Sequence, residues 1–311
     1  MRSFLLILTA VVFPAFAQNN LSAEAWLEKM SQALQETQYR ASMVQVQADH
    51  IRPLVYLHGN VDTQEVAFLE YLNGPPQKAV RVGGIVTFLE HDQPAYSVQA
   101  NRIQGTWPQS FSGNIQSLAK GYQFVLGGRG RIAGRPGQLI RFIPNDQYRF
   151  GYQVWLDMES YLPLRFDTLS REKSLLEQLM VVEMAVLDST PLVLTEAIKR
   201  SWPEASETNR RPSGREWSFS WLPDGFKIVI SDLHQLFGSG QPVEYISLSD
   251  GLVNLSVYVA PTGRGPLPEE LTTTNGLSIV TEKMGDFEIV VVGQAPSDTL
   301  MTIAKSLKLK K

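Results

Sequence analysis

The sequence predicts an α+β fold that is mostly antiparallel β: a large curved sheet with a helix lying on it, then a smaller α+β domain. Alternating apolar runs between Gly137 and Leu187 are separated by short polar breaks. This pattern indicates an antiparallel meander, because parallel neighbours need long crossovers. Earlier runs raise the total to roughly nine to eleven strands, and strand twist makes so large a sheet curl into an unclosed barrel.

Residues 1–17 are predicted to be a secretory signal peptide. Arg2 gives a positive start, an apolar core follows, and Ala15-Phe16-Ala17 is a small-x-small cleavage pattern, so we expect the mature chain to begin at Gln18. The apolar run is shorter than the ~20 residues that span a bilayer. The chain has no cysteine, so it offers no lipid anchor and must fold without disulfides. We therefore expect an exported, soluble protein.

A first helix is expected after Ser22, with an apolar stripe at Trp26, Met30 and Ala33 that suits packing on a sheet. The adjacent apolar pair at Met43 changes the phase of alternation, which predicts a bulge. The strand-like runs of this region are residues 43–48, 54–58, 65–72, 78–82 and 85–90.

Residues 114–120 fit a short helix, and 121–126 and 129–133 fit strands that lead into the meander. Within the meander, Tyr152 and Val154 are expected on one face of a strand and Trp155 on the other, because side chains alternate.

Residues 190–216 are expected to link two domains, 18–189 and 217–311. This stretch holds a short helical piece at 192–202 and then charge, proline and serine without apolar periodicity. We expect the contact between the domains to be modest and polar, as is usual within one chain. The second domain is expected to have a final helix from Ser297 and strands at 217–221, 226–233, 244–248, 252–260 and 287–292.

Composition excludes several function classes. Removing Arg2 with the signal segment leaves 27 basic against 31 acidic residues, which gives no support for nucleic-acid binding. The histidines are scattered and cysteine is absent, so we expect no metal site and no cofactor. There is no Gly-x-Ser-x-Gly elbow, so no catalytic residue is assigned and the chain is not expected to be an enzyme. A secreted hydrolase with a site assembled from distant residues is the alternative.

Residues 127–134 are rich in glycine and arginine. They lack the Gly-Lys-Ser/Thr ending of a phosphate loop and open no helix, so they favour a hairpin. Arginine suits phosphate and carboxylate groups alike, and Arg129, Arg131 and Arg135 are our candidate lipid contacts. A solvated or salt-bridged strand face is the alternative for this cluster, which continues through Arg141 and Arg149.

Phe88, Trp107 and Trp155 are the candidate contacts for acyl chains. Large apolar side chains are numerous for a sheet with one obvious covering helix, which favours an apolar cavity. Each of the three can equally be a core residue.

Several short motifs resemble the RseB/MucB family, periplasmic regulators of the sigma-E (AlgU-type) envelope stress response. They are spread over nearly the whole mature chain. The matching residues are 148–152, 155–157, 162–165, 221–226, 249–251, 256–259 and 290–293.

This resemblance implies an N-terminal domain similar to the lipoprotein carriers LolA and LolB, with a hydrophobic concavity. It implies a protein that binds the periplasmic domain of a membrane-bound anti-sigma factor of the RseA/MucA type and shields it from proteolysis. Release would follow when lipopolysaccharide or a similar lipid occupies the concavity. The alternative is a periplasmic lipid or lipoprotein carrier. A homo-oligomer stays open.

Overall fold

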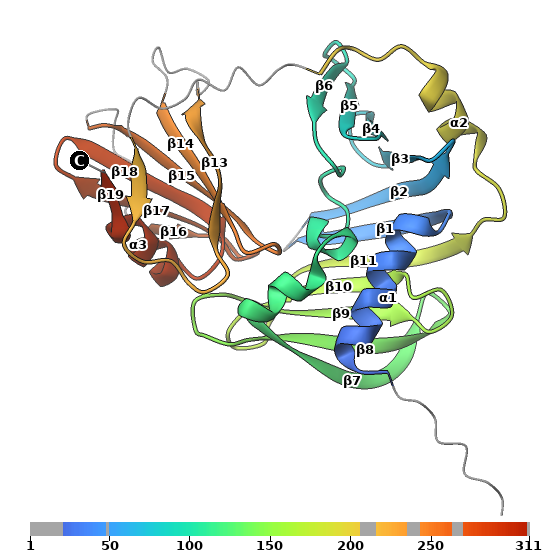
Figure 1. The fold of residues 1–311 in the computed structure, drawn as a ribbon, viewed down its shortest axis with the longest axis horizontal. Helices are drawn as coiled ribbons and strands as arrows, with labels where there is room; N and C mark the ends of the chain where they lie inside the picture. Colours follow the sequence, from blue (N-terminus) through green and yellow to red (C-terminus); the bar gives the residue numbers. More distant parts are fainter. Residues whose placement is uncertain (1–20, 48–49, 206–215, 235–242, 263–269, 310–311) are drawn as a thin grey trace, which may run out of the picture.

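The computed structural model describes residues 21–47, 50–205, 216–234, 243–262 and 270–309. Its larger sheet has 11 strands in the order β6-β5-β4-β3-β2-β1-β11-β10-β9-β8-β7, and every pair is antiparallel. The first and last strands meet in its middle, because β1 pairs with both β2 and β11. The sheet curves without closing (Figure 1), as the sequence predicts. Its strands are β1 (Tyr39–Gln47), β2 (His50–Val61), β3 (Gln64–Tyr71), β4 (Gln77–Val82), β5 (Ile85–Glu90), β6 (Tyr96–Gln99), β7 (Tyr122–Ile132), β8 (Arg135–Pro144), β9 (Gly151–Asp157), β10 (Pro163–Leu169) and β11 (Leu175–Val186).

One face of this sheet is covered by α1 (Ala23–Glu36), and we call it the helix face. Ser22 caps the helix by accepting a hydrogen bond from the Ala25 amide at 3.2 Å. The buried stripe of α1 packs with side chains from β1 through β10 in one hydrophobic cluster. The predicted bulge is confirmed, since the register between β1 and β11 shifts between Ser42 and Met43.

The opposite face of β2–β4 is covered by α2 (Leu192–Lys199), whose Leu194 and Ala197 pack against it. The indole of Trp202 donates to the Ala197 carbonyl at 2.8 Å, and Ala205 forms a parallel bridge with Ser97 of β6. Residues 190–205 of the expected linker therefore lie on the larger sheet. Residues 206–215 of that linker, and the expected signal segment 1–17, lie outside the described residues.

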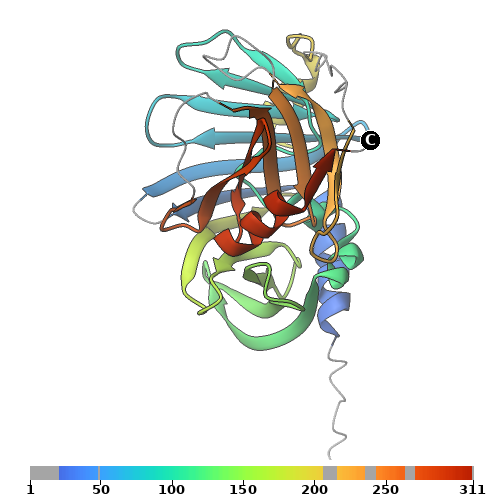
Figure 2. The same ribbon diagram turned by 90° about the vertical axis from the view of Figure 1, so that its left-hand side faces the viewer.

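The smaller domain has a six-stranded antiparallel sheet in the order β13-β14-β15-β18-β17-β16. The helix α3 (Ser297–Ser306) buries Leu300 and Ile303 against it, and Figure 2 shows this domain in front of the larger sheet. The elements are β12 (Trp217–Phe219), β13 (Lys227–His234), β14 (Val243–Ser249), β15 (Asn254–Pro261), β16 (Glu270–Thr272), β17 (Leu277–Met284), β18 (Phe287–Gln294) and β19 (Leu307–Leu309), which pairs with β12.

The sequence patterns missed four strands: β6, β16, β17 and β19. Three of them are only three or four residues long, too short for alternation to stand out. Residues 114–120 form a 3₁₀ turn, η2 (Ile115–Lys120), after a shorter one, η1 (Gln109–Ser112). The two strands expected at 121–133 are the single strand β7, whose register against β8 shifts between Leu126 and Arg129.

None of the helices among the described residues combines the length and apolar character needed to cross a bilayer.

Cutting the chain at a protease site inserted within residues 206–215 is expected to leave two folded pieces. The buried residues of the two large clusters are separate, one set between Ala23 and Met184 and the other between Trp217 and Leu307. Circular dichroism of each isolated piece should show a cooperative thermal transition. A piece that melts without one would place the boundary elsewhere; the uncut protein carrying the same insertion is the control.

Candidate ligand pockets and the contact between the two domains

Two neighbouring pockets lie on the helix face of β1–β6. The connection from β6 to η1, residues 100–113, passes from β6 toward α1 (Figure 1) and lines both of them. We call this connection the roof segment. The first pocket has a volume of about 410 Å³ and the second about 430 Å³. Pockets of this size suit small-molecule ligands.

A polar cluster forms one wall of the first pocket because strand register brings distant residues into one row. Tyr39 of β1 lies opposite His58 of β2, which lies opposite Ala67 of β3, which lies opposite Arg81 of β4. Residues two positions away on a strand share its face. Glu65 and Tyr56 therefore join the same wall.

The carboxylate of Glu65 has two partners in this cluster, His58 and Arg81. His58 Nε2 lies 2.9 Å from its Oε1, and the guanidinium of Arg81 forms an ion pair with the same oxygen. His58 Nδ1 donates to the Thr37 carbonyl at 2.8 Å. Burial alone would raise the pKa of Glu65, but the bonds from His58 and Arg81 outweigh it and lower that pKa.

The roof segment adds Arg102 and Trp107 to the first pocket. Arg102 Nη1 donates to the Trp107 carbonyl at 3.1 Å, and the Thr106 hydroxyl donates to the Ile103 carbonyl at 2.7 Å. Burial lowers the pKa of Arg102, and no carboxylate of the described residues forms an ion pair with it. The first pocket therefore contains more positive than negative charge.

The second pocket combines aromatic side chains with charged ones, among them Arg52, Lys78 and Glu90. Phe88 stacks on Tyr96 with ring centroids 5.2 Å apart, and Arg52 lies 4.0 Å over the ring of Tyr71. Gly105 of the roof segment has a φ of +83°, and a Cβ there would come 2.5 Å from the Tyr71 hydroxyl. Glycine is needed at this close approach.

The three candidate aromatic residues do not share one cavity. Trp107 lines the first pocket and Phe88 the second. Trp155 lines neither pocket: alternation turns it away from Val154 and Leu156, and it packs half-buried against the cluster to which they belong. There its ring covers a glycine, and a Cβ at Gly130 would meet it at 2.8 Å. Contact of Phe88, Trp107 and Trp155 with an acyl chain stays a prediction.

The arginines that lie close together in the sequence at 129–149 lie in different parts of the fold. The β7–β8 hairpin is confirmed, and within it Arg129 bonds Gln138 at 3.4 Å and Arg131 bonds the Gly134 carbonyl at 3.2 Å. Arg135 bonds the fully buried Asp157 at 2.8 Å. None of these three arginines lines either helix-face pocket. A role for them in lipid binding stays a prediction, beside the alternative of a salt-bridged strand face.

No group of three or more potential metal ligands occurs in the part of the chain that the structure describes.

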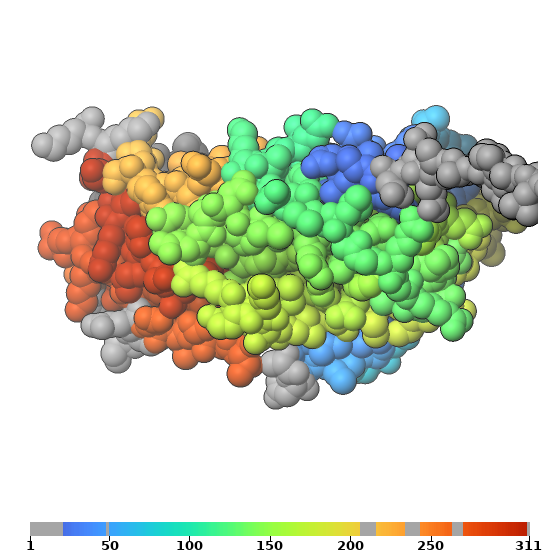
Figure 3. Space-filling view, turned by 90° about the horizontal axis from the view of Figure 1, so that it is seen from below, coloured from blue at the N-terminus to red at the C-terminus, as the bar shows by residue number. Residues whose placement is uncertain are grey.

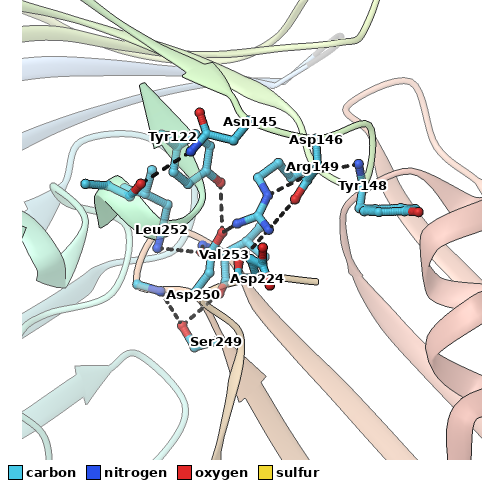
Figure 4. Close-up of polar contacts among 12 residues, drawn as sticks. Tyr122, Asn145, Asp146, Tyr148, Arg149, Asp224, Ser249, Asp250, Leu252 and Val253 are labelled. Carbon is cyan, nitrogen blue, oxygen red and sulfur yellow. Dashed lines mark hydrogen bonds and ion pairs between the residues drawn. The ribbon is translucent and has the colours of Figure 1, made fainter. Parts of the chain in front are cut away.

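Arg149 lies at the centre of the contact between the two domains (Figure 4). It extends from the β8–β9 loop and bonds Asp146 at 2.8 and 3.1 Å within its own domain. Across the contact it donates to Asp250 at 3.0 Å and to the Asp224 carbonyl at 2.6 Å. The side chains of Arg149 and Asp250 are each 1% exposed.

We call Arg149 and its partners Asp146, Asp224 and Asp250 the node. Tyr122 and two backbone amides supply the remaining hydrogen bonds of Asp250. Asp250 accepts from the Tyr122 hydroxyl at 2.9 Å and from the amides of Leu252 and Val253 at 3.0 Å. Burial opposes the charge of Arg149, but the bond to Asp146 and the nearby negative charges outweigh it, so the pKa is raised. Burial also holds the pKa of Tyr122 well above its usual value.

Weaker contacts surround this node. Tyr148 packs edge-on against Trp221 with centroids 4.8 Å apart, and Arg171 bonds both carboxylate oxygens of Asp298 at 2.8 and 2.9 Å. The smaller domain packs side by side with the green and yellow part of the chain (Figure 3). The contact is polar, as expected, but its centre is buried and fully bonded, so it is less easily shifted than a modest surface contact.

The roof segment and the domain contact are continuous along the chain. Past the pockets, Ser110 and Leu118 lie against Gly251 of the smaller domain, where a Cβ would come within 2.9 Å of Leu118. Lys120 lies against Gly225, and Tyr122 then reaches Asp250. Residues 100–122 thus line the ligand pockets at one end and contact the second domain at the other.

Sequence reasoning missed the polar cluster and the node. A detectable signal existed for the cluster: His58, Glu65 and Arg81 are ionisable residues at strand positions that alternate with apolar ones. Their pairing depends on register, however, which is fixed only when the strands associate. Arg149 was visible in the 148–152 motif, but its partners Asp224 and Asp250 are far away in sequence.

Family models match both parts of the chain. The MucB/RseB N-terminal domain matches residues 22–206, and the MucB/RseB C-terminal domain matches residues 211–308. The sigma-E factor regulatory protein RseB of Haemophilus influenzae is 30% identical over 292 residues, covering 93% of this chain and 92% of that protein. The sigma factor AlgU regulatory protein MucB of Pseudomonas aeruginosa is 24% identical, covering 98% and 96%.

Solved structures share the fold. MucB in complex with MucA(peri) aligns with a TM-score of 0.71 at 23% identity, covering 93% of this chain and 99% of that one. A Pseudomonas aeruginosa MucA/MucB complex aligns with a TM-score of 0.73 over the same shares. At this identity the likeness establishes the two-domain architecture alone.

Replacing Arg149 by Met should lower the free energy of unfolding by ~3–5 kcal/mol, because it leaves Asp250 buried without its ion pair. Adding Asp250→Asn should cost less than the sum of the single changes, which a double-mutant cycle in denaturant measures. Arg171→Met, which removes an exposed bridge at the same contact, is the control and should cost ~0–1 kcal/mol. Equal losses at Arg149 and Arg171 would contradict a central role for the buried node.

The buried Asp157 should make folding sensitive to acid. Burial alone would raise its pKa, but the bonds from Arg135 and Ser160 outweigh it and lower that pKa. A carboxyl group with a lowered pKa stabilises the fold above its unfolded pKa of about 4, and this contribution is lost as pH falls through the folded value. The unfolding free energy should therefore fall less steeply below about pH 4 in Arg135→Met than in the unmodified protein. Parallel curves would exclude this source of acid sensitivity.

Proposed function

This chain belongs to the MucB/RseB family, and from that membership we propose that it is a periplasmic negative regulator of a sigma-E-type stress response. It acts by binding the periplasmic domain of a membrane-bound anti-sigma factor. In doing so it shields that domain from the protease that begins its degradation. Lipopolysaccharide or a related lipid, bound by the larger domain, weakens the complex.

The observation that carries this proposal is the match of both domains, together, to sigma factor regulators along nearly their whole length. The curated relatives are named as regulators of sigma factors, which supports a binding role over an enzymatic one. A MucB crystallised with MucA(peri) has the same architecture, which supports an anti-sigma domain as the partner.

The pockets and the domain contact support the lipid part of the proposal. A ligand can change partner affinity only by binding two states of the protein differently. The roof segment lines the pockets and also contacts the smaller domain at Gly251 through Ser110, so a ligand that moves it acts on the contact. A coupling of ~1–3 kcal/mol would change partner affinity by roughly five- to 150-fold.

A lipid or lipoprotein carrier is the second candidate, supported by the pockets alone. A carrier would have no need for a second domain fixed to the first by a buried ion pair. A pull-down from a periplasmic extract separates the two: the regulator retains an anti-sigma domain, and the carrier retains lipoproteins.

The mature protein is expected to bind the purified periplasmic domain of its anti-sigma factor saturably, and to slow proteolysis of that domain. Saturating lipopolysaccharide should weaken this binding, as measured by calorimetry.

Tyr122→Phe removes one hydroxyl from the Asp250 node, so it should reduce the response to lipid while lipid binding persists. An Arg129/Arg131/Arg135 charge-reversed variant tests the hairpin arginines: a normal response to lipid there assigns them to a salt-bridged or solvated strand face, and thermal unfolding shows whether loss of the Arg135–Asp157 pair has unfolded the variant.

Absence of partner binding would contradict the regulatory function itself. Partner affinity that is unchanged by saturating lipid would contradict only the sensing mechanism.

A further inference from the structure

The geometry points to a phosphate- or carboxylate-bearing ligand in the first pocket, its anionic group bound by Arg102, Arg81 and the phenol of Tyr56. This inference rests on the proposed ligand sensing and goes further by naming the chemistry of the ligand's polar end. It assigns the polar end of the ligand to the first pocket and not to Arg129, Arg131 and Arg135 of the hairpin.

The charges of the pocket are unbalanced. Two guanidinium groups line it, with Glu65 as the carboxylate among its lining residues. Glu65 is already engaged by Arg81 and His58 through the same oxygen. Arg102 has a backbone carbonyl as its hydrogen-bond partner instead. A partly buried cation without a counter-ion is costly, and an entering anion removes that cost.

The pocket also has a hydrogen-bond donor that lacks an acceptor. Tyr56 is 8% exposed and lines the cavity, and no hydrogen bond to its hydroxyl forms within the described part of the chain. Burial raises the pKa of Tyr56 to about 12, so the phenol remains a donor at neutral pH. Arg81, 5% exposed, also lines the cavity; it is bonded to Glu65 and to the Asn101 carbonyl, so it contributes mainly its charge. Oxygens of a phosphate or carboxylate are the acceptors that such a site lacks.

The surroundings favour an anion that belongs to a larger molecule. A volume of about 410 Å³ is that of a small-molecule site. In the next cross-strand row, Tyr56 lies opposite Leu69, and Phe88 lies two strands further along. Both Leu69 and Phe88 line the second pocket, which therefore begins where the polar wall ends. A molecule whose anionic group lies in the first pocket can extend to Leu69 and Phe88 in the second.

A solution experiment with the full mature protein separates the two sources of the anion. Calorimetry is performed with inorganic phosphate, with dihexanoyl phosphatidic acid below its micelle concentration, and with the dihexanoyl phosphatidylcholine of equal chain length. We expect saturable binding of the phosphatidic acid and much weaker binding of the choline lipid. Saturable binding of phosphate with the same affinity would also support the anion site, but would assign it to a free anion.

Variants then assign the site to residues. Arg102→Gln should weaken binding of phosphatidic acid by about ten- to a hundredfold, as expected for a lost charge-assisted hydrogen bond. Tyr56→Phe should weaken it less, because one neutral donor is removed. Arg40→Gln makes the same change in charge outside both pockets, and its affinity should match that of the unmodified protein.

Two outcomes overturn the inference: no saturable binding of either phosphate probe, or an Arg102→Gln affinity equal to that of the unmodified protein. Thermal unfolding of each variant shows whether a loss of binding is a loss of folding. Binding of the anti-sigma domain is measured separately, so failure of the anion site leaves the proposed regulatory function standing, and the reverse also holds.

Discussion

The buried guanidinium of Arg149 fixes how the two domains lie against each other. Removing a charge from water costs several kcal/mol, and this cost is offset only when every partner is in place. Here the partners come from separate turns: Asp146 from the larger domain, and Asp250 and the Asp224 carbonyl from the smaller one. A rotation of the smaller domain would leave the charge without them. The surrounding contacts, such as the exposed Arg171–Asp298 bridge, can therefore be weak.

This node also determines what the roof segment can do. Tyr122, which bonds Asp250, comes soon after Leu118, which packs on Gly251, and the first pocket's lining ends shortly before, at Gly113. One continuous stretch of about twenty residues contributes side chains both to the ligand pocket and to the domain contact. A change in ligand binding can therefore reach the domain contact without a chain of distant intermediate residues. The central position of β1 serves the same end. It places Tyr39 beside His58, in the half of the sheet that the roof segment covers.

The candidate residues named from the sequence lie in several parts of the fold. Phe88 and Trp107 each line a pocket and Trp155 lines neither, and contact of all three with a ligand stays a prediction. A sequence shows which residues alternate along a strand but not which face is covered, so it could not assign Trp155 to a face. The arginines at 129–149 were grouped by proximity in sequence. Strand direction separates them: Arg131 lies beside the hairpin turn, whereas Arg149 lies at the far end of β8, at the domain contact.

The sequence by itself determined the secondary structure and its class. Alternation, caps and turn residues act over a few positions, so they are legible locally: the helix after Ser22, the bulge at Met43 and the meander from β8 to β11 all follow from them. The tertiary structure decided everything that depends on meetings between distant residues. The row from Tyr39 to Arg81 exists because four strands align in one register, and Arg149 meets Asp250 because two domains dock. A buried charge is tolerated only when its partners from distant parts of the chain are in place. Local sequence patterns do not show which distant residues will become those partners.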